Sequence, residues 1–155
     1  MATTRALIVA AVLLGTVALA SAQLKLVGTT VPGKVGVNPG ANFCQAVVTG
    51  ETAWLSGSLA PGANITAQTA GIMDTFNATL TSMGSSLESA VKATVMLTNI
   101  SDFQGMNNVY RTYFKVPPAR STFQVAALAS STGLVEIELE CYDPAFSKLK
   151  AVTTA

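Results

Sequence analysis

Arg120 is the residue that the sequence best prepares for binding a small anion. It follows Pro117 and Pro118, and an alternation of polar and apolar residues follows it. Two prolines stop a helix and restrict the backbone, so we expect a strand to begin here with the guanidinium held at a rigid turn. The chain has no histidine, which leaves an arginine as its best group for capturing a carboxylate. The alternative is an ordinary exposed arginine at a strand end.

A second set of chemical groups lies on the last predicted strand, residues 134–142. Glu136, Glu138 and Glu140 alternate there with apolar residues. A carboxylate in a cleft beside Arg120 can activate water as a general base. The same pattern also fits the solvated face of an antiparallel strand.

Composition excludes several kinds of chemistry. Without histidine there is no Ser-His-Asp or Cys-His nucleophile system, and with two cysteines and no CxxC pair we expect no metal site. A net charge of +1 with 11% charged residues argues against nucleic-acid binding. Cys44 and Cys141 either form one disulfide or remain as free thiols.

Residues 1–22 have the pattern of a cleaved secretory signal peptide. Arg5 precedes an apolar run from Ala6 to Ala20, and small residues surround the expected cleavage before Gln23. The run is shorter than the ~20 residues of a comfortable membrane span, although an uncleaved anchor is the alternative. We therefore expect a secreted protein that is not attached to a membrane after cleavage.

Three Asn-X-Ser/Thr triplets agree with export. They begin at Asn64, Asn77 and Asn99, and each is an acceptor sequence for N-linked glycans in a secretory lumen. Together with the signal peptide they predict a glycoprotein.

The mature chain reads as one domain, residues 40–145, between a lead-in at 23–39 and a tail at 146–155. The lead-in is expected to be irregular or short-stranded. Strands are predicted at 43–48, 53–56, 90–97, 121–128 and 134–142, and the first two form a hairpin. One helix is capped by Asn64 or Thr66 and ends at Gly84, and a second is capped by Ser101 and Asp102 and stops before Pro117.

This order, β-β-α-β-α-β-β, predicts an α+β fold with a mixed sheet. Two helices can cover only one face of such a sheet, so the other face must be polar or must meet another subunit. Few charges are available to cover it, which favours self-association.

An ordered set of residues gives the chain a family resemblance. Its most specific parts are the turn Pro118-Ala119-Arg120-Ser121 and the strand Val135-Glu136-Ile137-Glu138. The remaining members, in order, are Gly57, Gln68, Gly84, Asp102, Phe103, Asn107, Tyr110, Phe114, Val125 and Leu128. From about Gly40 to Tyr142 the chain resembles the Rid family of reactive-intermediate deaminases, also called YjgF-type or L-PSP proteins.

The resemblance implies a chorismate-mutase-like fold, a homotrimer packed through its sheets, and clefts between subunits. It implies hydrolysis of 2-imino or enamine acids to 2-oxo acids and ammonia without a cofactor. By the same resemblance Arg120 holds the substrate carboxylate and Glu136 activates water. The other implied contacts are Ser56, Asn107, Thr122, Phe43 and Gln45.

Two positions depart from the pattern of active members, because Phe43 and Thr122 stand where those members carry tyrosine and cysteine. The phenol donor is lost, and a hydroxyl replaces a thiol. The alternative function is therefore a catalytically degenerate secreted trimer that binds small carboxylates or protein partners. A nuclease activity has no support in the charge of the chain.

Overall fold

The structure is a computed structural model that describes residues 25–28 and 34–149. The predicted signal peptide lies outside the described residues, as does the end of the tail. The strands are β1 (Leu26–Gly28), β2 (Lys34–Pro39), β3 (Cys44–Thr49), β4 (Thr52–Ser58), β5 (Ala90–Leu97), β6 (Ala119–Gln124) and β7 (Val135–Tyr142). The helices are α1 (Ile65–Ser82) and α2 (Phe103–Tyr110), and short 3-10 turns are η1 (Leu87–Ser89), η2 (Ile100–Asp102), η3 (Arg111–Tyr113) and η4 (Pro144–Lys148).

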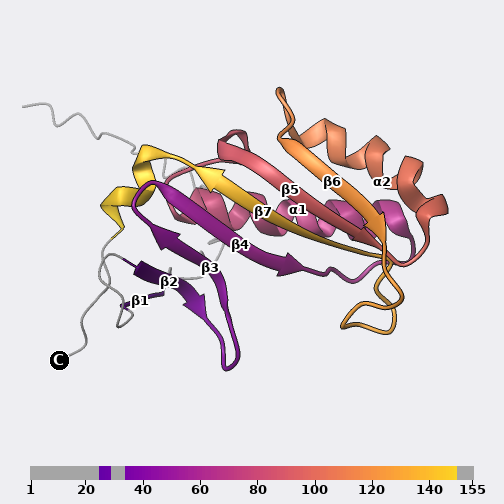
Figure 1. The fold of residues 1–155 in the computed structure, drawn as a ribbon, viewed down its shortest axis with the longest axis horizontal. Helices are drawn as coiled ribbons and strands as arrows, with labels where there is room; N and C mark the ends of the chain where they lie inside the picture. Colours follow the sequence, from indigo (N-terminus) through magenta and orange to yellow (C-terminus); the bar gives the residue numbers. More distant parts are fainter. Residues whose placement is uncertain (1–24, 29–33, 150–155) are drawn as a thin grey trace, which may run out of the picture.

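The strands form one mixed sheet in the order β1-β2-β3-β4-β7-β5-β6. Only the β5–β6 pair is parallel among the described pairs, because α2 carries the chain from one to the other. The two helices lie on one face of the sheet, behind it in the view of Figure 1. We call this the helix face and the other the open face. The fold is thus the α+β arrangement that the sequence predicts.

Helix α1 forms where the sequence places its signals. The side-chain oxygen of Asn64 accepts a hydrogen bond from the backbone N–H of Ala67 at 2.9 Å, which satisfies a free donor of the first turn. Gly84 has a φ of 78° just after the helix, a backbone conformation that glycine adopts without strain. The side chains that α1 buries against the sheet are Ile72, Met73, Phe76 and Leu80.

Strand β5 matches its predicted bounds, and the alternation of the sequence predicts Val91, Ala93, Val95 and Leu97 on one face. Ala93, Val95 and Leu97 are buried as expected, whereas Val91 is 51% exposed. The register against β7 shifts between Ala90 and Lys92. A bulge of this kind turns one side chain out of the alternation, so Ala90 takes the buried place instead.

At one end of the sheet the lead-in forms short strands, which the sequence allowed, and at the other end a strand stops earlier than predicted. Strands β1 and β2 extend it into the segment expected as a lead-in, and Val35 and Val37 of β2 belong to the core. Strand β6 ends at Gln124 rather than Leu128.

Cys44 and Cys141 are both free thiols. Cys141 lies opposite Ala53, which in turn lies opposite Val48. Val48 is four residues along β3 from Cys44, or about 14 Å at the rise of a strand. A disulfide needs Cα atoms within about 7 Å, so the register rules out the bridge within one chain.

No helix within residues 25–28 and 34–149 is long and apolar enough to span a membrane.

Candidate functional site

Arg120 lies on the helix face of the edge strand β6. It pairs with Ala93 of β5, whose side chain is buried in the core, so both point toward α2. The guanidinium carbon lies 4.8 Å from the ring centroid of Tyr110 and 5.7 Å from that of Phe103. As predicted, the proline-led turn brings the arginine directly into a strand.

A hollow of about 500 Å³ opens beside Arg120. Its lining residues are Gln104, Asn107, Tyr110, Arg111, Pro117, Pro118 and Arg120. The lining holds two arginines and no carboxylate, so its electrostatic potential favours an anion. The hollow brings together Arg120 and Asn107, two of the residues that the resemblance assigns to the site.

Two buried hydroxyl groups on this side of the sheet have no hydrogen-bond partner among the described residues. The hydroxyl oxygens of Tyr110 and Thr122 are both buried without a hydrogen bond. Burial raises the pKa of Tyr110 to about 12, although the positive charge of Arg120 acts in the opposite direction. Tyr110 is therefore a neutral phenol at physiological pH and does not serve as a counter-ion.

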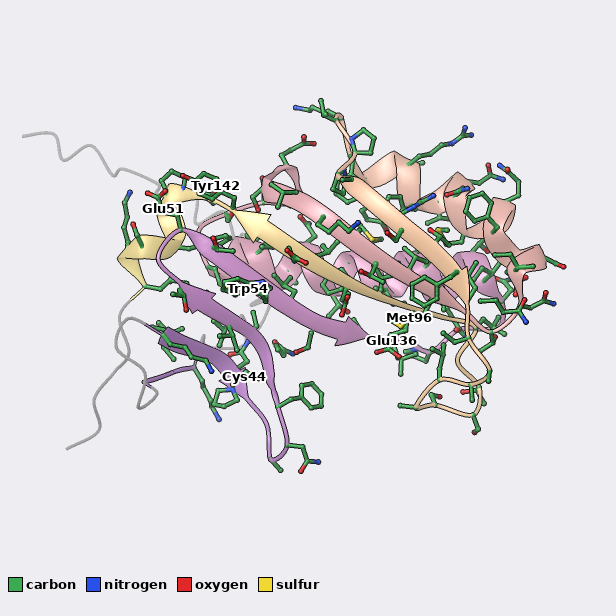
Figure 2. All side chains as sticks on the ribbon, in the orientation of Figure 1. Cys44, Glu51, Trp54, Met96, Glu136 and Tyr142 are labelled. Carbon is green, nitrogen blue, oxygen red and sulfur yellow. The ribbon has the colours of Figure 1, made fainter. Side chains whose placement is uncertain are left out.

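Glu136 lies on the open face. It pairs with Met96 of β5, and the next residue, Ile137, points into the core. Figure 2 shows it beside the end of β4. A Cβ atom on Gly57 would lie only 2.2 Å from the Glu136 side-chain oxygen Oε1, so the absence of a side chain at Gly57 makes room for the carboxylate.

A second hollow, of about 370 Å³, lies where β3 and β4 approach α1. It is lined by Phe43, Gln45, Leu55, Ser56, Gly57, Ser58, Leu59, Thr75, Phe76 and Thr79. The Ser56 hydroxyl donates to the Cys44 carbonyl oxygen at 2.8 Å, which ties the two strands together. Phe43 is 64% exposed and so is available to a ligand or to another chain.

The predicted site residues therefore form two groups within one chain. Arg120, Asn107 and Thr122 are on the α2 side, whereas Phe43, Gln45, Ser56 and Glu136 are around the end of β4. We call these the arginine group and the glutamate group. Because Arg120 and Glu136 point to opposite faces of the sheet, a single chain does not place them in one cleft.

Sequence reasoning missed Gln104 and Arg111 as lining residues. A signal for them exists, since Gln104, Asn107 and Arg111 recur at the spacing of one helical stripe. That polar stripe lies next to the stripe of Phe103, Met106 and Tyr110, whose spacing predicts the buried face of this helix.

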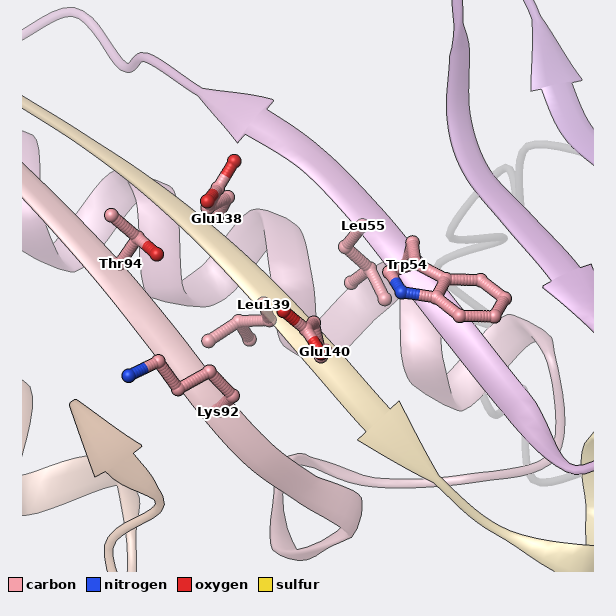
Figure 3. Close-up of a pocket in the computed structure, with 7 residues that line it drawn as sticks. All are labelled: Trp54, Leu55, Lys92, Thr94, Glu138, Leu139 and Glu140. Atoms are coloured by element: carbon pink, nitrogen blue, oxygen red, sulfur yellow. The ribbon is translucent and has the colours of Figure 1, made fainter. Parts of the chain in front are cut away.

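A third, much smaller hollow of about 100 Å³ lies on the open face (Figure 3). Trp54, Lys92, Thr94, Glu138 and Glu140 surround it with side chains from three adjacent strands. Trp54 is 45% exposed there. In the described part of the chain, no cluster of three or more histidine, cysteine, aspartate or glutamate side chains is arranged to hold a metal ion.

Comparison with known proteins now adds to this geometry. A family model described as "Endoribonuclease L-PSP" matches residues 34–142. Over 105 residues the chain is 39% identical to the 2-iminobutanoate/2-iminopropanoate deaminase of Capra hircus, covering 62% of this chain and 76% of that protein. The chain belongs to the Rid, or L-PSP, family.

Other Rid proteins are similar over the same region. The chloroplastic Reactive Intermediate Deaminase A of Arabidopsis thaliana is 34% identical over 108 residues, which are 64% of this chain but only 56% of that protein. The crystal structure of RidA from an Antarctic Psychrobacter bacterium has a TM-score of 0.63 at 35% identity, with 67% of this chain and 90% of that chain covered. The matched region begins at β2, which places β2 inside the Rid domain.

Proposed function

We propose that this protein hydrolyses reactive 2-imino acids, or their enamine tautomers, to 2-oxo acids and ammonia. The observation that carries the proposal is an arginine without an ion-pair partner among the described residues, at a hollow lined by two arginines and no carboxylate. Such a guanidinium can bind a substrate carboxylate through two parallel hydrogen bonds. The name of the goat relative, a 2-iminobutanoate/2-iminopropanoate deaminase, supports this substrate class.

The reaction needs only a bound carboxylate and an activated water. Arg120 and the Asn107 amide would fix the substrate so that its imine carbon is open to attack. Glu136 would take a proton from water as the water oxygen bonds to that carbon and the C=N electron pair moves to nitrogen. That proton would then pass to nitrogen and give a carbinolamine. The Glu136 carboxylate would next carry the proton of the new hydroxyl group to the same nitrogen, so that the C–N bond breaks and ammonia leaves as the C=O bond forms.

The two groups of the site would meet between copies of the chain. Because Arg120 and Glu136 lie on opposite faces of one sheet, the Arg120 of one copy would have to face the Glu136 of the next. A head-to-tail contact forms a ring when the rotation between copies closes, and we propose that it closes here. We therefore propose a homotrimer, with exposed open-face residues such as Trp54, Phe123 and Tyr142 at the contacts between sheets.

We further propose that the protein is exported and glycosylated. The side chains of Asn64, Asn77 and Asn99 are all exposed, so each can carry a glycan. Asn64 and Asn99 cap helical turns through their side-chain oxygens and leave their nitrogens for the linkage. A mass decrease after N-glycosidase treatment of protein from a eukaryotic secretory host, with an N-terminus at Gln23, is the expected result. An unchanged mass would contradict glycosylation.

The main test is a coupled assay in which an amino-acid oxidase or a PLP enzyme generates 2-iminopropanoate or 2-iminobutanoate. We expect the wild-type protein to accelerate imine loss. Arg120→Ala should lower kcat/KM by about a hundred-fold or more, since a buried charge-assisted contact contributes ~3 kcal/mol. Lys115→Ala is the matched control, because it also removes one positive charge but at an exposed position outside the lining of this hollow. Equal turnover by Arg120→Ala and wild type would reject the role of Arg120.

The same experiment addresses the second candidate, a trimer that binds carboxylates without turnover. The buried, unpartnered hydroxyl of Thr122 favours it, because this hydroxyl stands where active relatives are expected to carry a thiol. A rise in the melting temperature with a small 2-oxo acid, in the absence of turnover, would identify this second function.

A further inference from the structure

The guanidinium of Arg120 rests on three side chains of one helix. Phe103, Met106 and Tyr110 recur on a single stripe of α2, and all three contact it. Its ring contacts are 5.7 Å to Phe103 and 4.8 Å to Tyr110, and one guanidinium nitrogen approaches the Met106 sulfur at 3.9 Å. We call these three side chains, two aromatic rings and one thioether, the α2 shelf.

No carboxylate pairs with this arginine in the part of the chain that the structure describes. Its orientation therefore depends on the shelf. A cation over an aromatic ring is attracted by the electrons of the ring face. Such stacking leaves the edge of the guanidinium, where its N–H donors point, free for an anion.

Packing alone does not explain the two rings. Phe103 is 38% exposed although it is a large apolar side chain. It therefore contributes only part of the hydrophobic stabilisation that a fully buried phenylalanine would give. Tyr110 is only 3% exposed, and its hydroxyl is buried without a partner, which costs free energy that phenylalanine would avoid. What both side chains share is a ring that faces Arg120.

We propose that Phe103 and Tyr110 are positioning residues that hold the Arg120 guanidinium flat, with its donor edge turned to the substrate carboxylate. This inference rests on the proposed function, because it assigns the shelf to the same carboxylate-binding step. The shelf acts on the substrate only through Arg120. Its loss should therefore weaken carboxylate binding and leave the later steps at Glu136 intact.

The test compares ring-removing with ring-keeping variants. Phe103→Leu and Tyr110→Leu should each raise KM for 2-iminobutanoate about five-fold, the size expected for one partly desolvated cation–π contact, with kcat changed less than about two-fold. Phe103→Tyr and Tyr110→Phe should keep KM within about two-fold of wild type, because the ring remains. Unchanged KM in both leucine variants would overturn the proposal.

A matched control separates positioning from general stability. Tyr113 follows on the same helical stretch, and its hydroxyl donates to Asp74 at 2.9 Å rather than meeting Arg120. Tyr113→Leu should lower the melting temperature without changing KM. If it raises KM as much as Phe103→Leu does, the shelf has no special role. Phe103→Leu decides the matter if Tyr110→Leu does not fold, since Phe103 is partly exposed.

Binding of the product analogue 2-oxobutanoate, measured by calorimetry, keeps the two proposals apart. If the wild type binds it through Arg120 without turning over imines, the proposed function fails. The Kd values of the Phe103 and Tyr110 variants then still test whether the shelf positions Arg120. If turnover is normal and the Kd of Phe103→Leu equals that of wild type, the shelf fails and the function stands. In an Arg120→Ala background, Phe103→Leu should have no further effect on Kd, and a further loss would contradict action through Arg120. A wild type that neither binds nor turns over would overturn both.

Discussion

At the scale of single residues, the position of the Glu136 side chain depends on the absence of a Cβ atom at Gly57. The register between β4 and β7 shifts between Leu55 and Ser58, so Gly57 lies within an irregular part of β4 where the pairing is interrupted. There the Glu136 carboxylate occupies the space that a Cβ atom would fill. The backbone and the carboxylate approach each other closely at the point where the proposed water activation takes place.

We predict that Gly57→Ala separates activity from stability. The new methyl group would overlap the Glu136 oxygen, which is the far end of a flexible side chain and can swing away at a stability cost of about 1 kcal/mol or less. The displaced carboxylate would no longer hold its water, so kcat should fall at least about ten-fold.

The matched control is Glu138→Gln, which changes an exposed glutamate on the same face of β7 outside both groups of the site. It should retain kcat. Chemical denaturation and the coupled assay measure the two effects, and a Gly57→Ala protein with wild-type kcat would show that the observed position of Glu136 is unimportant.

At the scale of elements, alternation predicts strands well and their faces less well. In the alternation that follows Arg120, Phe123 is apolar and Thr122 is polar. Yet Phe123 is 45% exposed on the open face, whereas Arg120 and Thr122 face the helices. A period of two gives two faces but does not say which one the helices cover. That choice comes from pairing with β5, a contact distant in sequence.

The separation of Arg120 from Glu136 has the same cause. Both residues, and their strands, could be predicted from the sequence, because proline turns and alternation are local signals. Their faces follow from the registers Ala93 with Arg120 and Met96 with Glu136. Ala93 and Met96 are three residues apart on β5, so these two residues, each with its pairing partner, point to opposite faces of the sheet. Only the assembled sheet reveals this.

Gln68 illustrates how one side chain joins distant elements. It is a polar side chain that is only 2% exposed, and its amide is fully hydrogen-bonded. The amide nitrogen donates to the Gly62 and Thr132 carbonyls, and the amide oxygen accepts from the Leu134 N–H at 2.8 Å. It thereby connects the start of α1 to the segment that leads into β7. The strand that carries Glu136 is thus anchored from the helix layer.

We predict that Gln68→Leu lowers the free energy of unfolding by about 2–4 kcal/mol, because it leaves buried backbone groups without partners. Thr81→Ala, an exposed change on α1, should alter it by less than about 0.5 kcal/mol. Urea denaturation followed by circular dichroism measures both values. Equal stability of Gln68→Leu and wild type would mean that water replaces the amide without loss.

At the scale of the whole molecule, the arrangement of the two groups determines what an active unit must be. A single chain offers Arg120 on the helix face and Glu136 on the open face, and the sheet lies between these two side chains. In a closed ring each copy gives its arginine group to one neighbour and its glutamate group to the other. Every cleft would then contain residues of two chains.

This arrangement predicts that two inactive variants can restore activity together. Arg120→Ala and Glu136→Gln should each be inactive alone. When equal amounts are unfolded and refolded together, a cleft is complete if a Glu136→Gln chain supplies the arginine and an Arg120→Ala chain supplies the glutamate. Random assembly into a ring gives this at about one quarter of the clefts, so about one quarter of wild-type kcat per cleft should return.

The control is a mixture of the same two proteins without unfolding, which should stay inactive for as long as the rings do not exchange subunits. Light scattering checks that the refolded species has the mass of a trimer. A chain that supplied both residues to one cleft would give no activity in either mixture, because every chain carries one defect. Restored activity after joint refolding therefore distinguishes a cleft between copies from a cleft within one copy, and its absence from a well-formed trimer would contradict the shared site.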